Sequence, residues 1–294
     1  MLRAFTRLPR RLLRRLVDRY APPDIQTALR YVRDGGPAFP ARNMTVTAAV
    51  PATPVLVLAP HPDDEIIGMG GTLRLHLANG SPVTILYLTD GAGLGHGRDA
   101  RIRRRRAEAE AVGHACGVEQ LFWDTPDTEL TNDGKTVDAL IDVLGAVRPG
   151  CVYLPSLFDR HYDHLSTNAL LADALRRSPG ADVTVLGYEV WDNVPFQNYV
   201  VDVSRHMEEK RALMRLYRTP LEVTDFVRLC ECRGATHYML YVDSGLERGG
   251  DGYAEAFCRL DAATYVQVFD GYVGALREHR SPMLRHLAHG VTAG

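Results

Sequence analysis

The sequence predicts an α/β fold with a Rossmann-like, mostly parallel sheet flanked by helices. Short apolar runs of strand length alternate with helical segments over most of the chain, as in parallel sheets joined by helical crossovers. Several runs are continuously apolar, which is typical of strands buried on both faces. Polar clusters follow two of these runs, and the ligands of such sheets bind at the carboxyl ends of the strands. We therefore expect a site at that edge.

The length and composition fit one large domain with an appendage. The 294 residues carry a formal net charge of −2, with 46% hydrophobic and 24% charged residues, the balance of a globular protein with a sizeable core. This charge argues against nucleic-acid binding, which favours a strongly basic domain. Five cysteines in a chain this long indicate reduced thiols. With no signal peptide and no apolar stretch of about 20 residues, the expected location is cytoplasmic.

The first 50 residues are expected to be a basic N-terminal arm and linker, and residues 51–294 the main domain. Within residues 1–20, apolar side chains recur near helical spacing, arginines fill most other positions, and Pro9 interrupts the pattern. Such a segment is compatible with peripheral contact to a membrane surface. A helix that packs on its own domain, or a mobile arm, is the commoner explanation.

The elements of the main domain follow from its apolar runs and its breaks. Residues 55–59 predict a buried strand, and a glycine-rich turn leads from it to a helix near residues 72–78 that ends at Asn79-Gly80. The other strands are expected at residues 83–88, 121–123, 151–154, 183–187 and 199–203. The other helices are expected at residues 101–116, 137–147, 166–177 and 205–217. A further apolar run lies near residues 238–242.

Two polar clusters are expected at the same edge of this sheet. Residues 61–65 (His-Pro-Asp-Asp-Glu) follow the first strand, and residues 161–164 (His-Tyr-Asp-His) come shortly after residues 151–154. A catalytic zinc takes about three ligands from His, Asp, Glu or Cys and keeps a position for water. Each cluster alone is more often structural. Together they supply enough ligands and leave a carboxylate free to act as a base.

The first cluster also carries a family resemblance. Residues 59–65 (Ala-Pro-His-Pro-Asp-Asp-Glu) closely resemble the AHPDDE signature of the LmbE-like, or PIG-L, family of zinc N-deacetylases. Residues 161–164 are similar to the family's second motif, His-Pro-Asp-His, with Tyr162 in place of proline. The resemblance covers roughly residues 53–260 and leaves out the N-terminal arm.

The resemblance implies a ligand set and a base. His61, Asp64 and His164 would hold zinc, and Asp63 would take a proton from zinc-activated water. Because His and Asp side chains suit several divalent metals, Fe²⁺ is an alternative to zinc.

The resemblance also assigns roles around these ligands. His161 would stabilise the oxyanion that forms during hydrolysis, and Asp163 would hold the ring of His161. Arg105 would contact the substrate. Glu65 would brace the first loop rather than bind metal.

The function that the resemblance implies is hydrolysis of an N-acetyl group on an N-acetylglucosamine-type amino sugar conjugate, such as a thiol precursor, a secondary metabolite or a glycolipid. Two alternatives stay open: an amidase that cleaves a larger acyl group, such as a thiol-conjugate amide, and a zinc-stabilised sugar-binding module without turnover. The expected binding partner is a small-molecule amino-sugar substrate. The sequence is also compatible with a homo-oligomer.

The segment from Gly91 to Gly97 is rich in glycine. It is not followed by a helix in the spacing of a dinucleotide-binding motif, which makes a nucleotide site the weaker interpretation. We expect a flexible loop at the rim of the active site.

Overall fold

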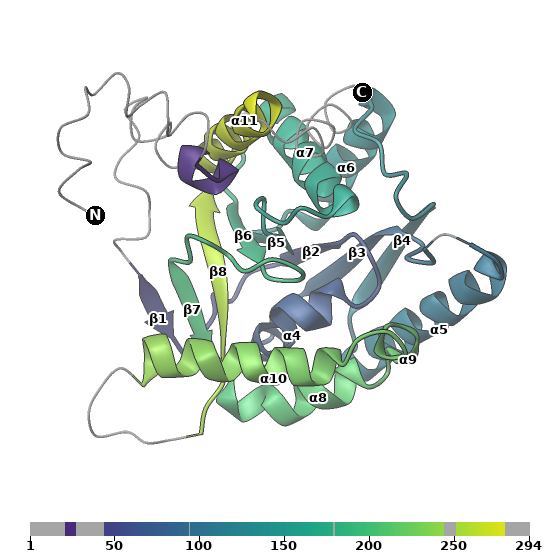
Figure 1. Ribbon diagram of the computed structural model, residues 1–294, viewed down its shortest axis with the longest axis vertical. Coiled ribbons are helices and arrows are strands. Elements are labelled where there is room, and N and C mark those ends of the chain that lie inside the picture. The colour runs from purple at the N-terminus through teal and green to yellow at the C-terminus, as the bar shows by residue number, and fades with distance from the viewer. Residues whose placement is uncertain (1–20, 28–43, 94, 179, 244–250, 280–294) are drawn as a thin grey trace.

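One eight-stranded sheet lies between two layers of helices (Figure 1). The structure is a computed structural model, and it describes residues 21–27, 44–93, 95–178, 180–243 and 251–279. The expected α/β class and the mostly parallel sheet are confirmed. The basic segment of residues 1–20 lies outside the described residues. Among those that are described, no helix is both long and apolar enough to span a membrane.

The sheet combines a parallel core with an antiparallel strand. Its strands are β1 (Thr45–Thr47), β2 (Val55–Ala59), β3 (Val83–Thr89), β4 (Glu119–Thr125), β5 (Cys151–Pro155), β6 (Thr184–Tyr188), β7 (Tyr199–Asp202) and β8 (Ala254–Asp261). They lie in the order β1-β7-β8-β6-β5-β2-β3-β4. Strands β2 to β6 are parallel, whereas β8 runs antiparallel to β6 and β7. Because β1 pairs with β7, the sheet takes in residues that the sequence assigns to a linker.

Helices cover both faces of this sheet. They are α4 (Asp64–Ala78), α5 (Arg98–Cys116), α6 (Gly134–Val147), α7 (Tyr162–Arg177), α8 (Met207–Met214), α9 (Arg218–Leu221), α10 (Phe226–His237) and α11 (Ala262–Glu278), with short helical turns at Ser204–His206 and Tyr238–Val242. In Figure 1, α6, α7 and α11 lie on one face, and α4, α5, α8 and α10 on the other. Alternate residues of β2 enter the two cores: Leu56 and Leu58 pack in one, Val55 and Val57 in the other. This explains why the strand is continuously apolar.

The first helix of the main domain differs from the sequence expectation. It begins at Asp64 rather than near Thr72, so the glycine-rich segment is helical and not a turn. A Cβ atom on Gly68 would lie 2.1 Å from the ring of Tyr188, and one on Gly71 would lie 2.5 Å from Val203. Glycine disfavours helices, but here it lets the helix pack directly against its neighbours.

A buried histidine near the end of α4 gives the fold a pH dependence. Burial lowers the pKa of His76 to about 4, and its Nε2 lies 2.9 Å from the hydroxyl of Tyr153. The unfolded chain, with a histidine pKa near 6.5, binds the proton more tightly. The contribution of neutral His76 to the free energy of unfolding is therefore fully present above about pH 6.5. It is lost as the pH drops towards 4, and about 2 kcal/mol is lost at pH 5.

Urea unfolding at pH 7.5 and pH 5 tests this expectation. His76→Gln stays neutral, so its stability should fall less between the two pH values than that of the wild type. The exposed His114 supplies the control, and His114→Gln should follow the wild type. Equal losses in wild type and His76→Gln would show that His76 does not cause the effect.

Candidate functional site

The two polar clusters meet at the carboxyl ends of β2 and β5. His61 follows β2, and Asp63 and Asp64 stand where α4 begins. His161 directly precedes α7, and His164 lies in the first turn of that helix. The parallel pairing of β2 with β5 brings the two loops to one edge, as the sequence predicts.

A buried carboxylate lies between two imidazole rings at this edge. Oδ2 of Asp64 is 3.2 Å from Nδ1 of His61 and 3.3 Å from Nε2 of His164. Side-chain nitrogens of His61, His161 and His164 lie within 4.8 Å of one another. Although burial opposes it, the two contacting histidines hold the pKa of Asp64 well below its usual range. The site thus offers an ionised carboxylate and neighbouring imidazoles, a donor set suited to a divalent metal.

The surroundings of His61 and His164 also support a metal site. Both ring nitrogens of His164 are buried, and within the described part of the chain neither makes a hydrogen bond. The nitrogen turned away from Asp64 faces a second carboxylate in each ring: Nε2 of His61 lies 3.1 Å from Oδ2 of Asp163, and Nδ1 of His164 lies 3.3 Å from Oδ2 of Asp159. A carboxylate behind a ligating histidine fixes the ring and raises its basicity. The residues present therefore fit a metal.

Asp163 differs from the expectation that it holds the ring of His161. Its carboxylate contacts His61 instead and accepts a hydrogen bond from the backbone N–H of Thr128 at 2.8 Å. The loop after β4 therefore helps to hold this carboxylate against His61. Nδ1 of His161 is buried and has no hydrogen-bond partner among the described residues. Burial, with His61 and His164 nearby, lowers the pKa of His161 to about 4, so its ring is neutral near pH 7.

Two carboxylates at the site are absent from the sequence-based assignment. Asp159 accepts the backbone N–H groups of His161 and Trp191, each at 3.0 Å, and so joins two loops behind His164. Oδ1 of Asp127 lies 3.5 Å from Nε2 of His61. Asp127 follows β4 at the same edge of the sheet, and this position after a strand could have marked it as a site residue.

The environment of Asp63 suits a proton acceptor. Its two oxygens each lie 3.3 Å from a guanidinium nitrogen of Arg105. Burial raises the pKa of Asp63 to about 6; the charge of Arg105 opposes the rise, and that of Asp64 adds to it. Its backbone has φ 130° and ψ −27°, a conformation that side-chain-bearing residues rarely adopt and that marks functional sites. A carboxylate with a pKa near neutrality can exchange protons at working pH.

The neighbours of Asp63 hold it in place. Arg105, expected to contact substrate, pairs with Asp63 and also lines the adjoining cavity. Glu65 accepts the backbone N–H of Asp63 at 3.1 Å and hydrogen bonds from the hydroxyls of Tyr87 and Tyr217. These contacts are those of a residue that braces the loop.

A cavity of about 400 Å³ opens next to these groups. Its polar side includes His61, Asp63, Asp64 and His161. The segment from Gly91 to Gly93 contributes to its lining, so the start of the glycine-rich loop lies at the site as expected. Much of the remaining wall is apolar, and this part is formed by Ile67, Ala92, Val190, Trp191, Pro220, Val223 and Phe226.

Two large side chains of the apolar wall are open to solvent. Trp191 is 53% exposed and Val223 86% exposed, and the ring of Trp191 packs edge-on against Phe226 with centroids 5.6 Å apart. Large exposed apolar side chains beside a polar site are typical of a ligand-binding surface.

Known proteins share both the sequence pattern and the fold. The sequence profile of a family described as "PIG-L: GlcNAc-PI de-N-acetylase" matches residues 56–175. A diacetylchitobiose deacetylase of Thermococcus kodakarensis is 30% identical over 188 residues, which are 56% of this chain and 69% of that protein. A 4-oxalmesaconate hydratase of Pseudomonas putida is 30% identical over 136 residues, 42% of this chain and 50% of the hydratase.

A solved structure extends the likeness to the fold as a whole. An N,N'-diacetylchitobiose deacetylase from Pyrococcus horikoshii superposes with a TM-score of 0.58 at 24% identity, covering 81% of this chain and 92% of the other. At this level of identity the match shows a common architecture.

Proposed function

Because the chain belongs to the PIG-L, or LmbE-like, family, we propose that it is a metal-dependent N-deacetylase. Its substrate is an amino sugar conjugate of the N-acetylglucosamine type, and its products are acetate and a free amine. The observation that carries the proposal is the buried set of His61, Asp64 and His164 beside Asp63, next to a cavity whose wall includes His61, Asp63 and Asp64.

We assign the metal to His61, Asp64 and His164. Zinc is the metal proposed, and Fe²⁺ suits the same donors. When bound, the metal supplies a Lewis acid for the amide carbonyl and lowers the pKa of water. Asp163 and Asp159 orient the two histidine rings from behind.

The proton transfers fall to Asp63. Its carboxylate removes a proton from the water that attacks the amide carbon, and the raised pKa of this group fits that role. The C–N bond then breaks, and the proton held by Asp63 passes to the departing nitrogen. Arg105 keeps the carboxylate oriented through both of its oxygens.

His161 stabilises the charge that develops on the former carbonyl oxygen. Its ring lines the cavity, and because Nδ1 is buried, Nε2 is the nitrogen proposed to face the substrate. A neutral imidazole donates one hydrogen bond, and a preorganised donor at such an oxygen is worth roughly 3 kcal/mol.

A substrate panel tests the reaction. N-acetylated amino sugars, their glycosides and analogues with larger N-acyl groups are incubated with metal-loaded protein, and released amine and carboxylate are both measured. We expect equal amounts of the two from N-acetyl substrates. Preference for a long acyl group would identify an amidase, and hydration of a double bond, as in the hydratase relative, would release neither product.

The apolar wall predicts that the rest of the conjugate is apolar. Trp191→Ala should raise KM for an aryl or alkyl glycoside of N-acetylglucosamine at least about tenfold, because burial of a large apolar side chain contributes about 1.5–3 kcal/mol. The KM for free N-acetylglucosamine should change little.

Steady-state kinetics on both substrates check this prediction. Met239 is 61% exposed but does not line the cavity, so Met239→Ala is the matched control. An equal rise in KM for both substrates would place the effect of Trp191 on the sugar instead of the apolar group.

A further inference from the structure

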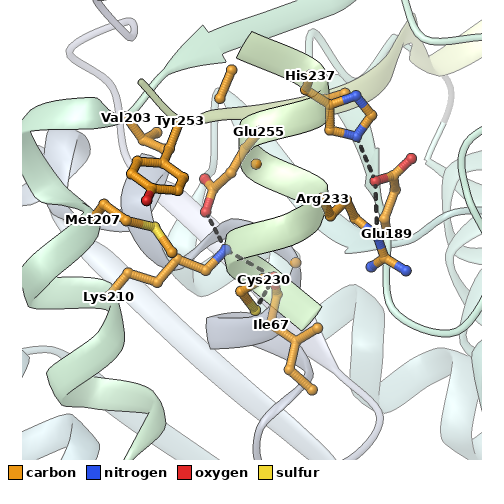
Figure 2. A pocket seen from close by; sticks show the side chains of 14 residues that line it. Ile67, Glu189, Val203, Met207, Lys210, Cys230, Arg233, His237, Tyr253 and Glu255 are labelled. Atoms are coloured by element: carbon orange, nitrogen blue, oxygen red, sulfur yellow. Dashed lines mark hydrogen bonds and ion pairs between the residues drawn. The ribbon is translucent and has the colours of Figure 1, made fainter. Parts of the chain in front are cut away.

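A buried ion pair lies behind the helix that begins at the site. Nζ of Lys210, from α8, is 2.6 Å from Oε1 of Glu255, from β8, and the two side chains are only 4% and 6% exposed. Both line a small cavity with Cys230 and Ile67 (Figure 2). Neither lines the larger cavity beside His61. The roles assigned above make no use of these two charges.

The ion pair sits at a break in α4. The helix is interrupted at Met69, where φ is −144° and ψ is 20°. Lys210 Nζ donates to the carbonyl of Ile67 at 2.9 Å, just before the break. The two oxygens of Glu255 accept the backbone N–H groups of Gly71 and Thr72 at 2.9 and 2.7 Å, just after it.

Each charge thus completes one of the two helix ends that the break creates. A helix leaves carbonyls without partners at its C-terminal end and N–H groups without partners at its N-terminal end. Cations stabilise the first kind of end and anions the second. Lys210 and Glu255 therefore close α4 on both sides of Met69, and they set off its first turn as a separate unit.

This first turn carries the chemistry of the site. Asp64 begins it, and Ile67 lines both the small cavity behind the helix and the larger one beside His61. A Cβ on Gly70 would approach Cγ of Lys210 to 3.0 Å, so the aliphatic stem of the lysine also packs closely on the helix. The position of the turn is thereby tied to α8 and β8.

We propose that Lys210 and Glu255 are positioning residues, which fix the first turn of α4 so that Asp64 meets His61 and His164 in metal-binding geometry. The proposal takes this ligand set from the proposed function. Stability alone does not account for two buried charges, because apolar residues of similar volume often give a protein that is equally or more stable. The pair instead fixes where the helix breaks.

Cobalt binding tests the proposal without any enzymatic reaction. Wild type, Lys210→Met and Lys210→Arg are titrated with Co²⁺, and both the affinity and the visible absorption spectrum are recorded. Lys210→Met should bind about tenfold more weakly, at the low end of the 10- to 100-fold loss typical of residues that contact a ligand directly, because Lys210 acts through the backbone of the turn. Its spectrum should also change. Lys210→Arg, which keeps the cation, should restore much of both.

The neighbouring Arg211 provides a matched control on the same helix. It is paired with Glu208, Glu231 and the hydroxyl of Tyr253, none of which belongs to α4. Arg211→Met should lower the melting temperature and leave cobalt affinity and spectrum unchanged. If Lys210→Met does not fold, Glu255→Gln, which keeps one carbonyl acceptor for the break, replaces it.

The outcomes separate the two proposals. A Lys210→Met protein that melts earlier but binds cobalt like the wild type would overturn the positioning role, as would an equal loss of affinity in Arg211→Met. A wild type that binds no divalent metal would overturn the proposed function itself.

Discussion

Asp63→Asn is expected to lower kcat by 10²- to 10⁴-fold, the contribution typical of a general base, while the protein still binds its metal. Asparagine keeps the shape of the side chain and an oxygen for Arg105 but accepts no proton at neutral pH. The proposed metal ligands are His61, Asp64 and His164, so the metal content of the variant should be unchanged. Amine release at saturating substrate, together with elemental analysis of the same sample, measures both quantities.

The control for this variant is an aspartate at the same edge of the sheet. The side chain of Asp124 is 57% exposed and pairs with Arg106, so Asp124→Asn should retain nearly full activity. A melting curve of Asp63→Asn reports the cost of leaving the buried Arg105 without its counter-charge. Activity of metal-loaded Asp63→Asn close to wild type would refute the assigned base. If the metal-loaded wild type also binds the sugar without releasing amine, the protein is a sugar-binding module and not an enzyme.

His164→Ala is expected to weaken metal affinity by more than 100-fold and to reduce amine release to background. Loss of a ligand should exceed the 10- to 100-fold cost typical of outer-sphere partners. Asp159→Asn gives that smaller step for comparison, because Asp159 contacts the far nitrogen of the same ring. Competition against a chelator of known affinity measures all three proteins.

The exposed His114 is the control, since His114→Ala should bind metal like the wild type. The structure also offers a second donor group, in which His61 joins Asp127 and Asp163 with ligand atoms within 4.8 Å. If His164→Ala keeps the metal affinity of the wild type and Asp127→Asn loses it, the metal binds to His61, Asp127 and Asp163. This result would overturn the proposed ligand set.

The parts of this structure that sequence reasoning predicts are those encoded locally. Buried parallel strands have continuous apolar sequences, so β2, β3, β5 and β6 lie at or near their expected positions. The half-exposed β4 and the strand β7 also lie close to theirs. The motif at His61 follows directly from the end of a buried strand. The motif at His161 could be placed beside it because ligands of such sheets bind at the edge where parallel strands end.

The parts that sequence reasoning misses depend on distant contacts. The early start of α4 requires glycines that only make sense once Tyr188 and Val203 lie against them. Asp163 reaches His61 across 102 positions of the chain, and no spacing pattern near Asp163 distinguishes that partner from His161. The strand β8 and the helices α10 and α11 belong to a region whose periodicity is less regular.

The role proposed for Asp63 would tie catalysis to a trade-off in evolution. Its positive φ costs on the order of 1–3 kcal/mol for a residue with a side chain, and glycine would relieve most of that cost. As long as turnover is selected, the carboxylate is worth more than the strain. A descendant that only bound sugar would be free to drift to glycine at this position and become more stable, so the residue found there reports whether a lineage still hydrolyses its ligand.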